Sequence, residues 1–247
     1  MDSRSIEAGH LTRIHDSVLA DPERRILGVI VARMPSWVMP DHMTAIGVLG
    51  GAMVGAGCLL AHLDTSWLLL SIAGLLVNWF GDSTDGSLAR FRGIERPRYG
   101  FFVDQFADVM AHFLMLFGLG LSPLMRFDVA LMALLGSLLI MFYGHLKLQF
   151  SRSWQVSHHG VGPTELRLLI AAGLIWAMLA PLPSIELGAT SLSLFDVVAI
   201  AVFIGALMAI GLMFIGDRTK LSVIDPPRGG IPAEVRVTPI DRRYNDA

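Results

Sequence analysis

Four aspartates within a short stretch of the chain are the residues best suited to chemistry. Asp82, Asp85, Asp104 and Asp108 lie beside or inside two long apolar segments. A carboxylate at the centre of a membrane-spanning helix costs about 2.5–3.5 kcal/mol, so four of them need compensation. Divalent cations provide it, because hard cations prefer carboxylate oxygens. The sequence therefore predicts a metal site built from these aspartates.

The spacing of the aspartates divides them into two pairs. Asp82 and Asp85 are three residues apart and share one face of a helix, as Asp104 and Asp108 do at a spacing of four. Two helices joined by a short basic connection can present these pairs to each other. Two divalent ions about 3.5–4 Å apart, as in phosphoryl-transfer sites, match this arrangement. The alternative, buried salt-bridge partners or a helix-capping cluster, accounts less well for four carboxylates.

Small and basic residues are interleaved with the aspartates. Gly86 and Ala89 fall on the helix face of the first pair and leave room for a ligand beside the backbone. Gly100 does the same one turn before the second pair, and Arg90 lies where it can reach a phosphate. This pattern predicts that the acidic site receives an anionic ligand.

The composition is that of a membrane protein. The chain has 247 residues, of which 53% are apolar and 16% charged, whereas a soluble domain averages about 25% charged residues. A net charge of −2 gives no support for a nucleic-acid partner. Residues 1–20 contain no apolar run, so we expect no cleavable signal peptide. We therefore expect an all-α integral membrane protein with a single bundle.

Six apolar segments predict six transmembrane helices, since each has about the 20 residues that span a bilayer. They are 43–62, 66–83, 101–122, 128–147, 166–183 and 195–215. The second is expected to continue as a helix through Arg90, and the fifth is the shortest. Glycines in the first segment predict close helix packing, within the chain or in a homodimer.

A short amphipathic helix is predicted before the first segment. Asp21 is expected as its N-cap, with Pro22 at the first helical position. Arg24 to Met34 then alternates apolar and basic residues in a pattern typical of a helix lying in the membrane interface, or of an extramembrane helix packed on a core. We expect a cytoplasmic N-terminal arm over 1–41, a membrane catalytic domain over 42–216 and a disordered cytoplasmic tail over 217–247.

The basic residues predict the orientation. With the N-terminus inside, all of the 19 Lys and Arg residues except Arg126 fall on the inner side. Cytoplasmic loops carry this excess of positive charge. The aspartate stretch is therefore expected at the cytoplasmic face.

The aspartate stretch also resembles a known signature. The pattern Asp82-x2-Asp85-Gly86-x2-Ala89-Arg90-x9-Gly100-x3-Asp104-x3-Asp108 resembles that of the CDP-alcohol phosphotransferases, with every fixed position in register over 27 residues. The stretch Pro40 to Thr44 before the first apolar segment is also similar. Asp41 stands there where the family often has Asn, and an aspartate at this position can also cap the following helix.

The resemblance implies an enzyme in which the hydroxyl of an acceptor alcohol displaces CMP from a CDP-linked alcohol. Asp82, Asp85 and Asp104 would hold two Mg²⁺ or Mn²⁺ ions, while Asp108 would reach one ion and act as the general base. The residues around the nucleotide would be Thr44, Asp82, Asp85, Gly86, Ala89, Arg90 and Gly100. The resemblance implies CDP-diacylglycerol as a donor, phospholipid biosynthesis as the role and a bacterial inner (plasma) membrane as the location.

Basic residues around the fourth connection suggest an acceptor pocket. Lys147, Arg152 and Arg167 would bind the phosphate of a water-soluble polyol such as glycerol 3-phosphate or inositol phosphate. The alternative is that these basic residues reflect only the positive-inside topology and the snorkelling of their side chains at the membrane interface. Glu165 would instead suit an amino-alcohol cation, and the sequence leaves the role of the Gly160–Glu165 loop undecided.

Two other classes of protein fit part of the pattern. A polyprenyl transferase has paired aspartate motifs, usually far apart in a longer bundle, and releases pyrophosphate rather than CMP. A divalent-cation transporter has intramembrane carboxylates but no evident use for the interleaved Gly, Ala and Arg.

Overall fold

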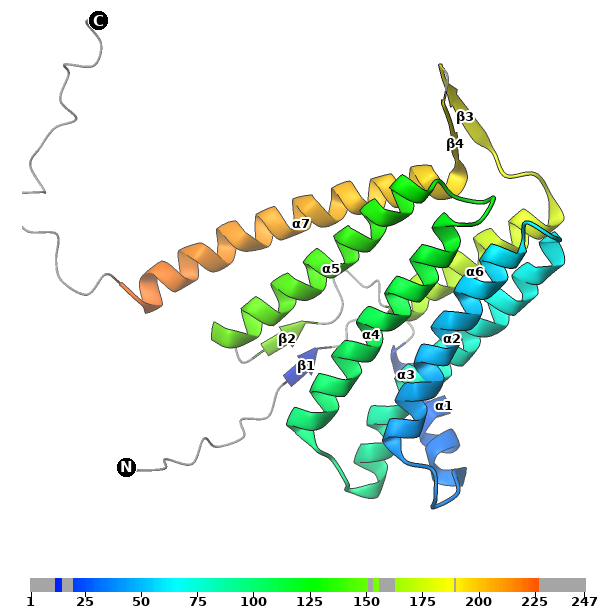
Figure 1. Cartoon of the computed structure of the whole chain (residues 1–247). Coiled ribbons are helices and arrows are strands. Elements are labelled where there is room, and N and C mark those ends of the chain that lie inside the picture. Colours follow the sequence, from blue (N-terminus) through cyan, green and yellow to red (C-terminus); the bar gives the residue numbers. More distant parts are fainter. Residues whose placement is uncertain (1–11, 15–19, 151–152, 156–162, 189, 227–247) are drawn as a thin grey trace, which may run out of the picture. The chain divides into compact units, whose positions relative to one another are not determined.

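The fold is mainly helical. The computed structural model describes residues 12–14, 20–150, 153–155, 163–188 and 190–226. The chain divides into two compact units, residues 1–206 and 207–247. The helices are α1 (Ala20–Arg33), α2 (Pro40–Leu60), the short 3-10 helix η1 (Thr65–Trp67), α3 (Leu68–Arg92), α4 (Pro97–Gly120), α5 (Phe127–Phe150), α6 (Pro163–Leu179) and α7 (Leu194–Ile224) (Figure 1). The unit boundary falls within α7.

The six predicted apolar segments correspond in order to α2 through α7. Among the described residues, four helices are long and apolar enough to cross a membrane, namely α2, α4, α5 and α7. The helix α3 carries a polar and charged end, and α6 has only 17 residues. The prediction of a mainly helical protein with helices able to span a membrane is confirmed, whereas the count of six spans stays a prediction.

Two short strand pairs depart from the all-α prediction. The strands β3 (Ser184–Leu187) and β4 (Thr190–Ser193) form an antiparallel hairpin between α6 and α7. The strands β1 (Thr12–Ile14) and β2 (Ser153–Gln155) pair in parallel. Both pairs lie in connections outside the apolar segments, where the apolar pattern carried no information.

Three helix ends differ from the prediction. The helix α1 begins at Ala20, so Asp21 lies in its first turn and the prediction of Asp21 as N-cap is wrong. Met39 is the N-cap of α2, so Asp41 does not cap that helix either. The helix α7 ends at Ile224 rather than at 215.

The end of α3 agrees with the prediction. This helix continues past Arg90 to Arg92, as expected. It stops because Gly93 adopts a left-handed conformation with φ of 65°, which glycine tolerates best. The connection to α4 therefore starts immediately after the first half of the aspartate stretch.

The helix α2 lies between α3 and α4 and packs closely on both (Figure 1). A Cβ added at Gly50 would lie 2.7 Å from the Cα of Asn78 on α3, and one at Gly55 would collide with the backbone of Leu114 on α4. Glycine permits this approach of helix backbones. The glycines of α2 predicted to pack closely are buried within the chain, so they are not available for a homodimer contact.

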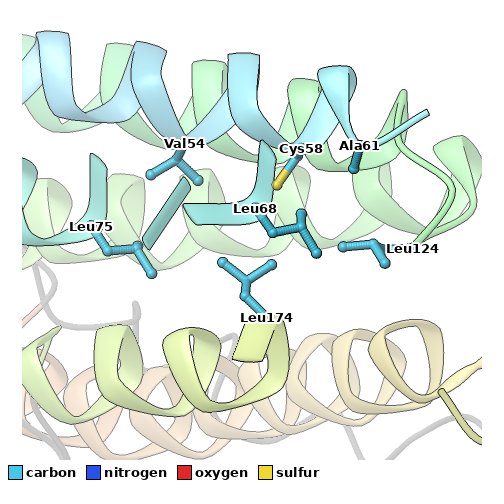
Figure 2. Packing of buried hydrophobic residues seen from close by; sticks show 7 residues of the cluster. All are labelled: Val54, Cys58, Ala61, Leu68, Leu75, Leu124 and Leu174. Atoms are coloured by element: carbon cyan, nitrogen blue, oxygen red, sulfur yellow. The ribbon is translucent and has the colours of Figure 1, made fainter. Parts of the chain in front are cut away.

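The main apolar core joins α2, α3 and α6 near one end of these helices. Its buried members are Val54, Cys58, Ala61, Leu68, Leu75, Leu124 and Leu174 (Figure 2). Leu174 brings α6 onto the α2–α3 pair, and the Oγ of Ser71 donates a 2.9 Å hydrogen bond to the carbonyl of Val54. This core holds the helices together at one end, and their polar residues lie toward the opposite end.

The helix α1 packs on α3 at the other end. Val31 belongs to a buried cluster with Val38, Met43 and Leu88. Arg92, in the last turn of α3, donates hydrogen bonds to four carbonyls of the turn between α1 and α2, at residues 34, 35, 36 and 38. The interfacial placement of α1 stays a prediction, although the opposite face of this helix leaves apolar side chains exposed.

Asp196, which is 1% exposed, holds the hairpin to the start of α7. Its carboxylate accepts hydrogen bonds from the backbone N–H groups of Ser193 and Arg126, each at 2.8 Å. The Oγ of Ser193 in turn accepts from the backbone N–H of Asp196 at 3.1 Å. This reciprocal cap links the connections that precede α5 and α7.

Candidate functional site

The four aspartates of α3 and α4 line one cavity. Asp82, Asp104 and Asp108 each offer a carboxylate oxygen, and these oxygens all lie within 4.8 Å of one another. Asp85 lines the same cavity. The four aspartates whose spacing predicted two facing pairs therefore share one cavity, although the closest group is a triad rather than two equal pairs.

Asp85 is held by two donors. The Oγ1 of Thr44 on α2 donates a 2.7 Å hydrogen bond to its Oδ2, and the backbone N–H of Gly86 donates to its Oδ1. Both Asp85 and Thr44 are buried. Charge-assisted hydrogen bonds of this kind fix the orientation of a carboxylate. Thr44, which the family resemblance places near the nucleotide, therefore lies against the aspartate cluster.

The helix α2 forms a third wall of the cavity, of which only Thr44 was among the predicted site residues. Thr44, Gly47 and Val48 line the cavity together with Ala107 and Ala111 of α4. A Cβ at Gly47 would lie 3.3 Å from the backbone nitrogen of Asp82, so glycine here brings α2 against the turn of α3 that carries Asp82. The cavity is therefore bounded by three helices.

Asn78 is a site residue that the sequence argument missed. It is 4% exposed, lines the cavity, and its Nδ2 donates a 2.9 Å hydrogen bond to the carbonyl of Gly47. Asn78 precedes Asp82 by four residues, so the two share a face of α3. A single amide in an apolar segment, in helical register with an aspartate, was the available signal.

Arg167 reaches the site from the first turns of α6. Its Nη2 lies 2.6 Å from Oδ2 of Asp82, and its Nε donates a 2.9 Å hydrogen bond to Oδ1 of Asn78. The side chains of Arg167 and Asp82 are 17% and 27% exposed, so solvent screens this pair only partly. The guanidinium thus brings a positive charge to the edge of the acidic cluster.

The small and basic residues of the stretch lie at the end of α3 and the start of α4. A Cβ at Gly86 would lie 3.2 Å from Nη1 of Arg90, so the guanidinium folds back over that glycine. The Nη2 of Arg90 donates a 3.3 Å hydrogen bond to Oγ of Ser87. Ala89 is half-buried, and Gly100 is exposed with open space beside its Cα.

Other predicted residues lie away from the described cavity or outside the described residues. Lys147 is half-buried on α5 and is not part of the cavity lining. Arg152 lies outside the described residues, as do 160–162 of the predicted loop.

Asp41 has a different role from the predicted cap. Its two carboxylate oxygens each lie 3.0 Å from Nη2 of Arg96, and one accepts a 2.9 Å hydrogen bond from the hydroxyl of Tyr99. The Arg96 guanidinium also stacks over the Tyr99 ring. Asp41 therefore ties the start of α2 to the connection between α3 and α4.

The aspartate triad suits a hard divalent cation. All of its ligand groups are carboxylates, and oxygen donors of this type are preferred by Mg²⁺ and Mn²⁺ rather than by softer metals. The buried Asp85 beside the triad adds further negative charge for a cation to neutralise. The residues present therefore fit a metal ion.

The chain is similar to known proteins over the region that contains this site. A family model described as CDP-alcohol phosphatidyltransferase matches residues 37–215, which include all four aspartates. The chain is also 29% identical over 105 residues to a protein named archaetidylinositol phosphate synthase from Pyrococcus horikoshii. That match covers 42% of this chain and 53% of the relative, so the chain spans about half the length of this curated relative.

Proposed function

The chain belongs to the CDP-alcohol phosphatidyltransferase family, and we propose that it transfers a substituted phosphate group from a CDP-linked alcohol to the hydroxyl of an acceptor alcohol, releasing CMP. The observation that carries the proposal is the convergence of four aspartates from two helices on one cavity. The family match favours this reaction over polyprenyl transfer and cation transport, neither of which releases CMP.

The aspartates are proposed to hold two Mg²⁺ or Mn²⁺ ions. Asp82, Asp104 and Asp108 supply the close ligand triad, and Asp85 supplies a further carboxylate oriented by Thr44. Bound cations would neutralise the diphosphate and the developing charge on the leaving CMP.

Asp108 is proposed as the general base. A carboxylate in the cavity can take the proton of the acceptor hydroxyl as that oxygen attacks phosphorus, while the bond from phosphorus to the CMP oxygen breaks. Helix α4 holds Asp108 one turn from Asp104, so the base would lie beside the cation site. We expect Asp108→Asn to lose nearly all turnover while keeping most of its affinity for the donor.

The nucleotide is proposed to lie along the end of α3. Gly86 and Ala89 limit side-chain bulk there, Gly100 does so on α4, and Arg90 supplies a cation for a phosphate oxygen. Thr44 would lie near the cytidine diphosphate through its contact with Asp85. We expect Asp85→Asn to weaken metal and nucleotide binding together.

The donor is proposed to be a lipid such as CDP-diacylglycerol, used in phospholipid biosynthesis. The apolar helices make the chain an integral membrane protein, so a donor can keep its acyl chains in the bilayer and its head group in the cavity. We propose six spans and a bacterial inner membrane as the location. We propose a cytoplasmic site because almost all basic residues fall on one side of the predicted topology.

The acceptor is proposed to be a phosphorylated polyol. Arg167 at the cavity edge supports this class, since a guanidinium suits a phosphate. The name of the Pyrococcus horikoshii relative, which refers to inositol phosphate, supports the same class. Lys147 and Arg152 would contribute further charge from the connection between α5 and α6.

The test uses the purified full chain in detergent with CDP-diacylglycerol, Mg²⁺ or Mn²⁺, and a panel of acceptors. The panel contains glycerol 3-phosphate, inositol phosphate, inositol, serine and ethanolamine, and CMP release is measured for each. We expect turnover with a phosphorylated polyol and none without metal. Turnover with only unphosphorylated acceptors would refute the acceptor class, and release of pyrophosphate instead of CMP would refute the reaction.

A further inference from the structure

Outside the aspartate cavity, one carboxylate joins three separate helices. Oε1 of Glu23 on α1 accepts 2.8 Å hydrogen bonds from Nε1 of Trp79 and Oγ of Ser83, both on α3. Its Oε2 accepts a 3.0 Å hydrogen bond from Oγ1 of Thr164 at the start of α6. All four side chains are partly buried. Glu23 therefore links α1, α3 and the first turn of α6.

The residues of α3 that contact Glu23 are sequence neighbours of those that contact Arg167. Trp79 and Ser83 directly follow Asn78 and Asp82 on α3 and keep the same spacing of four residues. On α6, Thr164 precedes Arg167 by three residues and so shares its face of the helix. The first turns of α6 are thus attached to α3 at two places, directly through Arg167 and indirectly through Glu23.

Two attachment points constrain a helix more than one does. With the Arg167 contact alone, the start of α6 can rotate about that side chain, whereas a second contact at Thr164 fixes the direction from which the guanidinium approaches Asp82. A side chain locked by surrounding hydrogen bonds keeps a functional group within the narrow range that a site requires. The Glu23 link is therefore placed to orient Arg167.

We propose that Glu23 is a positioning residue, which fixes the start of α6 against α3 and thereby holds Arg167 at the edge of the aspartate site. Glu23 does not line the cavity, so it acts through Thr164 and Arg167 rather than on substrate. The part of this inference that concerns catalysis rests on the proposed function, in which Arg167 serves the acceptor phosphate.

The chemistry of the contacts predicts which substitutions are tolerated. A glutamine at position 23 keeps one oxygen for Trp79 and Ser83, and its amide N–H can donate to the hydroxyl of Thr164. An alanine at that position removes all three hydrogen bonds. Asp21 is a matched control, because it is an exposed acid in the same first turn of α1.

The kinetic test compares Glu23→Ala, Glu23→Gln and Asp21→Ala. We expect Glu23→Ala to raise the KM for the acceptor about tenfold, as for the loss of one strong positioning contact, with kcat and the donor KM nearly unchanged. Glu23→Gln should restore most of the acceptor affinity, and Asp21→Ala should match the wild type. Equal acceptor KM values in Glu23→Ala and Asp21→Ala, or an equal rise in the donor KM, would overturn the proposal.

A second measurement does not depend on activity. Backbone hydrogen exchange in the first two turns of α6 should be faster in Glu23→Ala than in the wild type, Glu23→Gln or Asp21→Ala. If no acceptor supports CMP release by the wild type, the proposed function fails, and unchanged exchange would separately refute the positioning role. Should Glu23→Ala not fold, Thr164→Val removes one hydroxyl at the same link and is expected to raise both the exchange rate and the acceptor KM.

Discussion

Substituting Gly50 by alanine tests whether the close approach of α2 and α3 builds the site. A Cβ at Gly50 would lie 2.7 Å from both the Cα of Asn78 and the carbonyl oxygen of Gly74, and even closer to the backbone nitrogen of Asn78. Carbon atoms rest near 3.5–4.0 Å apart, so α3 would have to retreat by roughly 1 Å. The backbone of a helix cannot yield as a flexible side chain does.

The size of the effect follows from two opposing contributions. Overpacking of this kind costs about 1–3 kcal/mol in the free energy of unfolding. Replacing glycine by alanine in an open helix gains about 1 kcal/mol through helix propensity. Gly205 on α7 is the matched control, since a Cβ there meets nothing within 4 Å. Both variants share this gain, so it cancels in the comparison, and we expect Gly50→Ala to be about 1–3 kcal/mol less stable than Gly205→Ala.

The assay is thermal unfolding of both purified variants in the same detergent, followed by far-ultraviolet circular dichroism. The expected difference in the free energy of unfolding corresponds to a difference in Tm of about 2–12 °C for a chain of this size. Because Asn78 and Asp82 lie on the displaced part of α3, Gly50→Ala should also bind Mn²⁺ more weakly, as measured by electron paramagnetic resonance. A Tm for Gly50→Ala equal to or above that of Gly205→Ala would refute the proposed packing.

Three further predictions concern the metal site and two polar links. Asp104→Asn should lower the affinity for Mn²⁺ at least about tenfold in a binding titration, whereas Asp41→Asn, which alters a carboxylate outside the triad, should leave it unchanged. Arg92→Met should lower the free energy of unfolding by about 2 kcal/mol, because four carbonyls lose a charged donor; Arg98→Met, at an exposed position, should change it by less than about 0.5 kcal/mol. Asp196→Ala should lower the free energy of unfolding by about 2–4 kcal/mol, because it leaves two backbone N–H groups without their carboxylate acceptor. Denaturation curves that superimpose on those of the wild type would contradict this.

Features that depend on neighbouring residues were predictable from the sequence. The continuation of α3 past Arg90 followed from local propensity, and the sharing of faces by the aspartates followed from the helical period. The apolar segments located α2 to α7 because a chain in a bilayer must satisfy its backbone hydrogen bonds within each segment. The helix ends were less predictable. Aspartate often caps a helix, yet α1 and α2 each begin one residue before Asp21 and Asp41.

Features that depend on contacts between distant segments required the tertiary structure. The position of α2 as the third wall of the cavity depends on how its glycines fit the backbones of α3 and α4. The pairing of Asp41 with Arg96 joins residues 55 positions apart, and that of Thr44 with Asp85 joins residues 41 positions apart. No local pattern encodes such pairings, because each depends on which faces the packed helices present to one another.

The aspartate site contains both features that the sequence predicted and features that required the tertiary structure. By itself the sequence determined that Asp82, Asp85, Asp104 and Asp108 would face a common space, because helical spacing fixes the face on which each side chain lies. Only the tertiary structure decided that Asn78 lines that space and that Arg167, suggested by the sequence for the acceptor phosphate, contacts Asp82 and Asn78 at its edge. The physical reason is that α6 reaches α3 through side-chain packing and hydrogen bonds, and residues so far apart in the chain carry no mutual spacing from which their contact can be predicted.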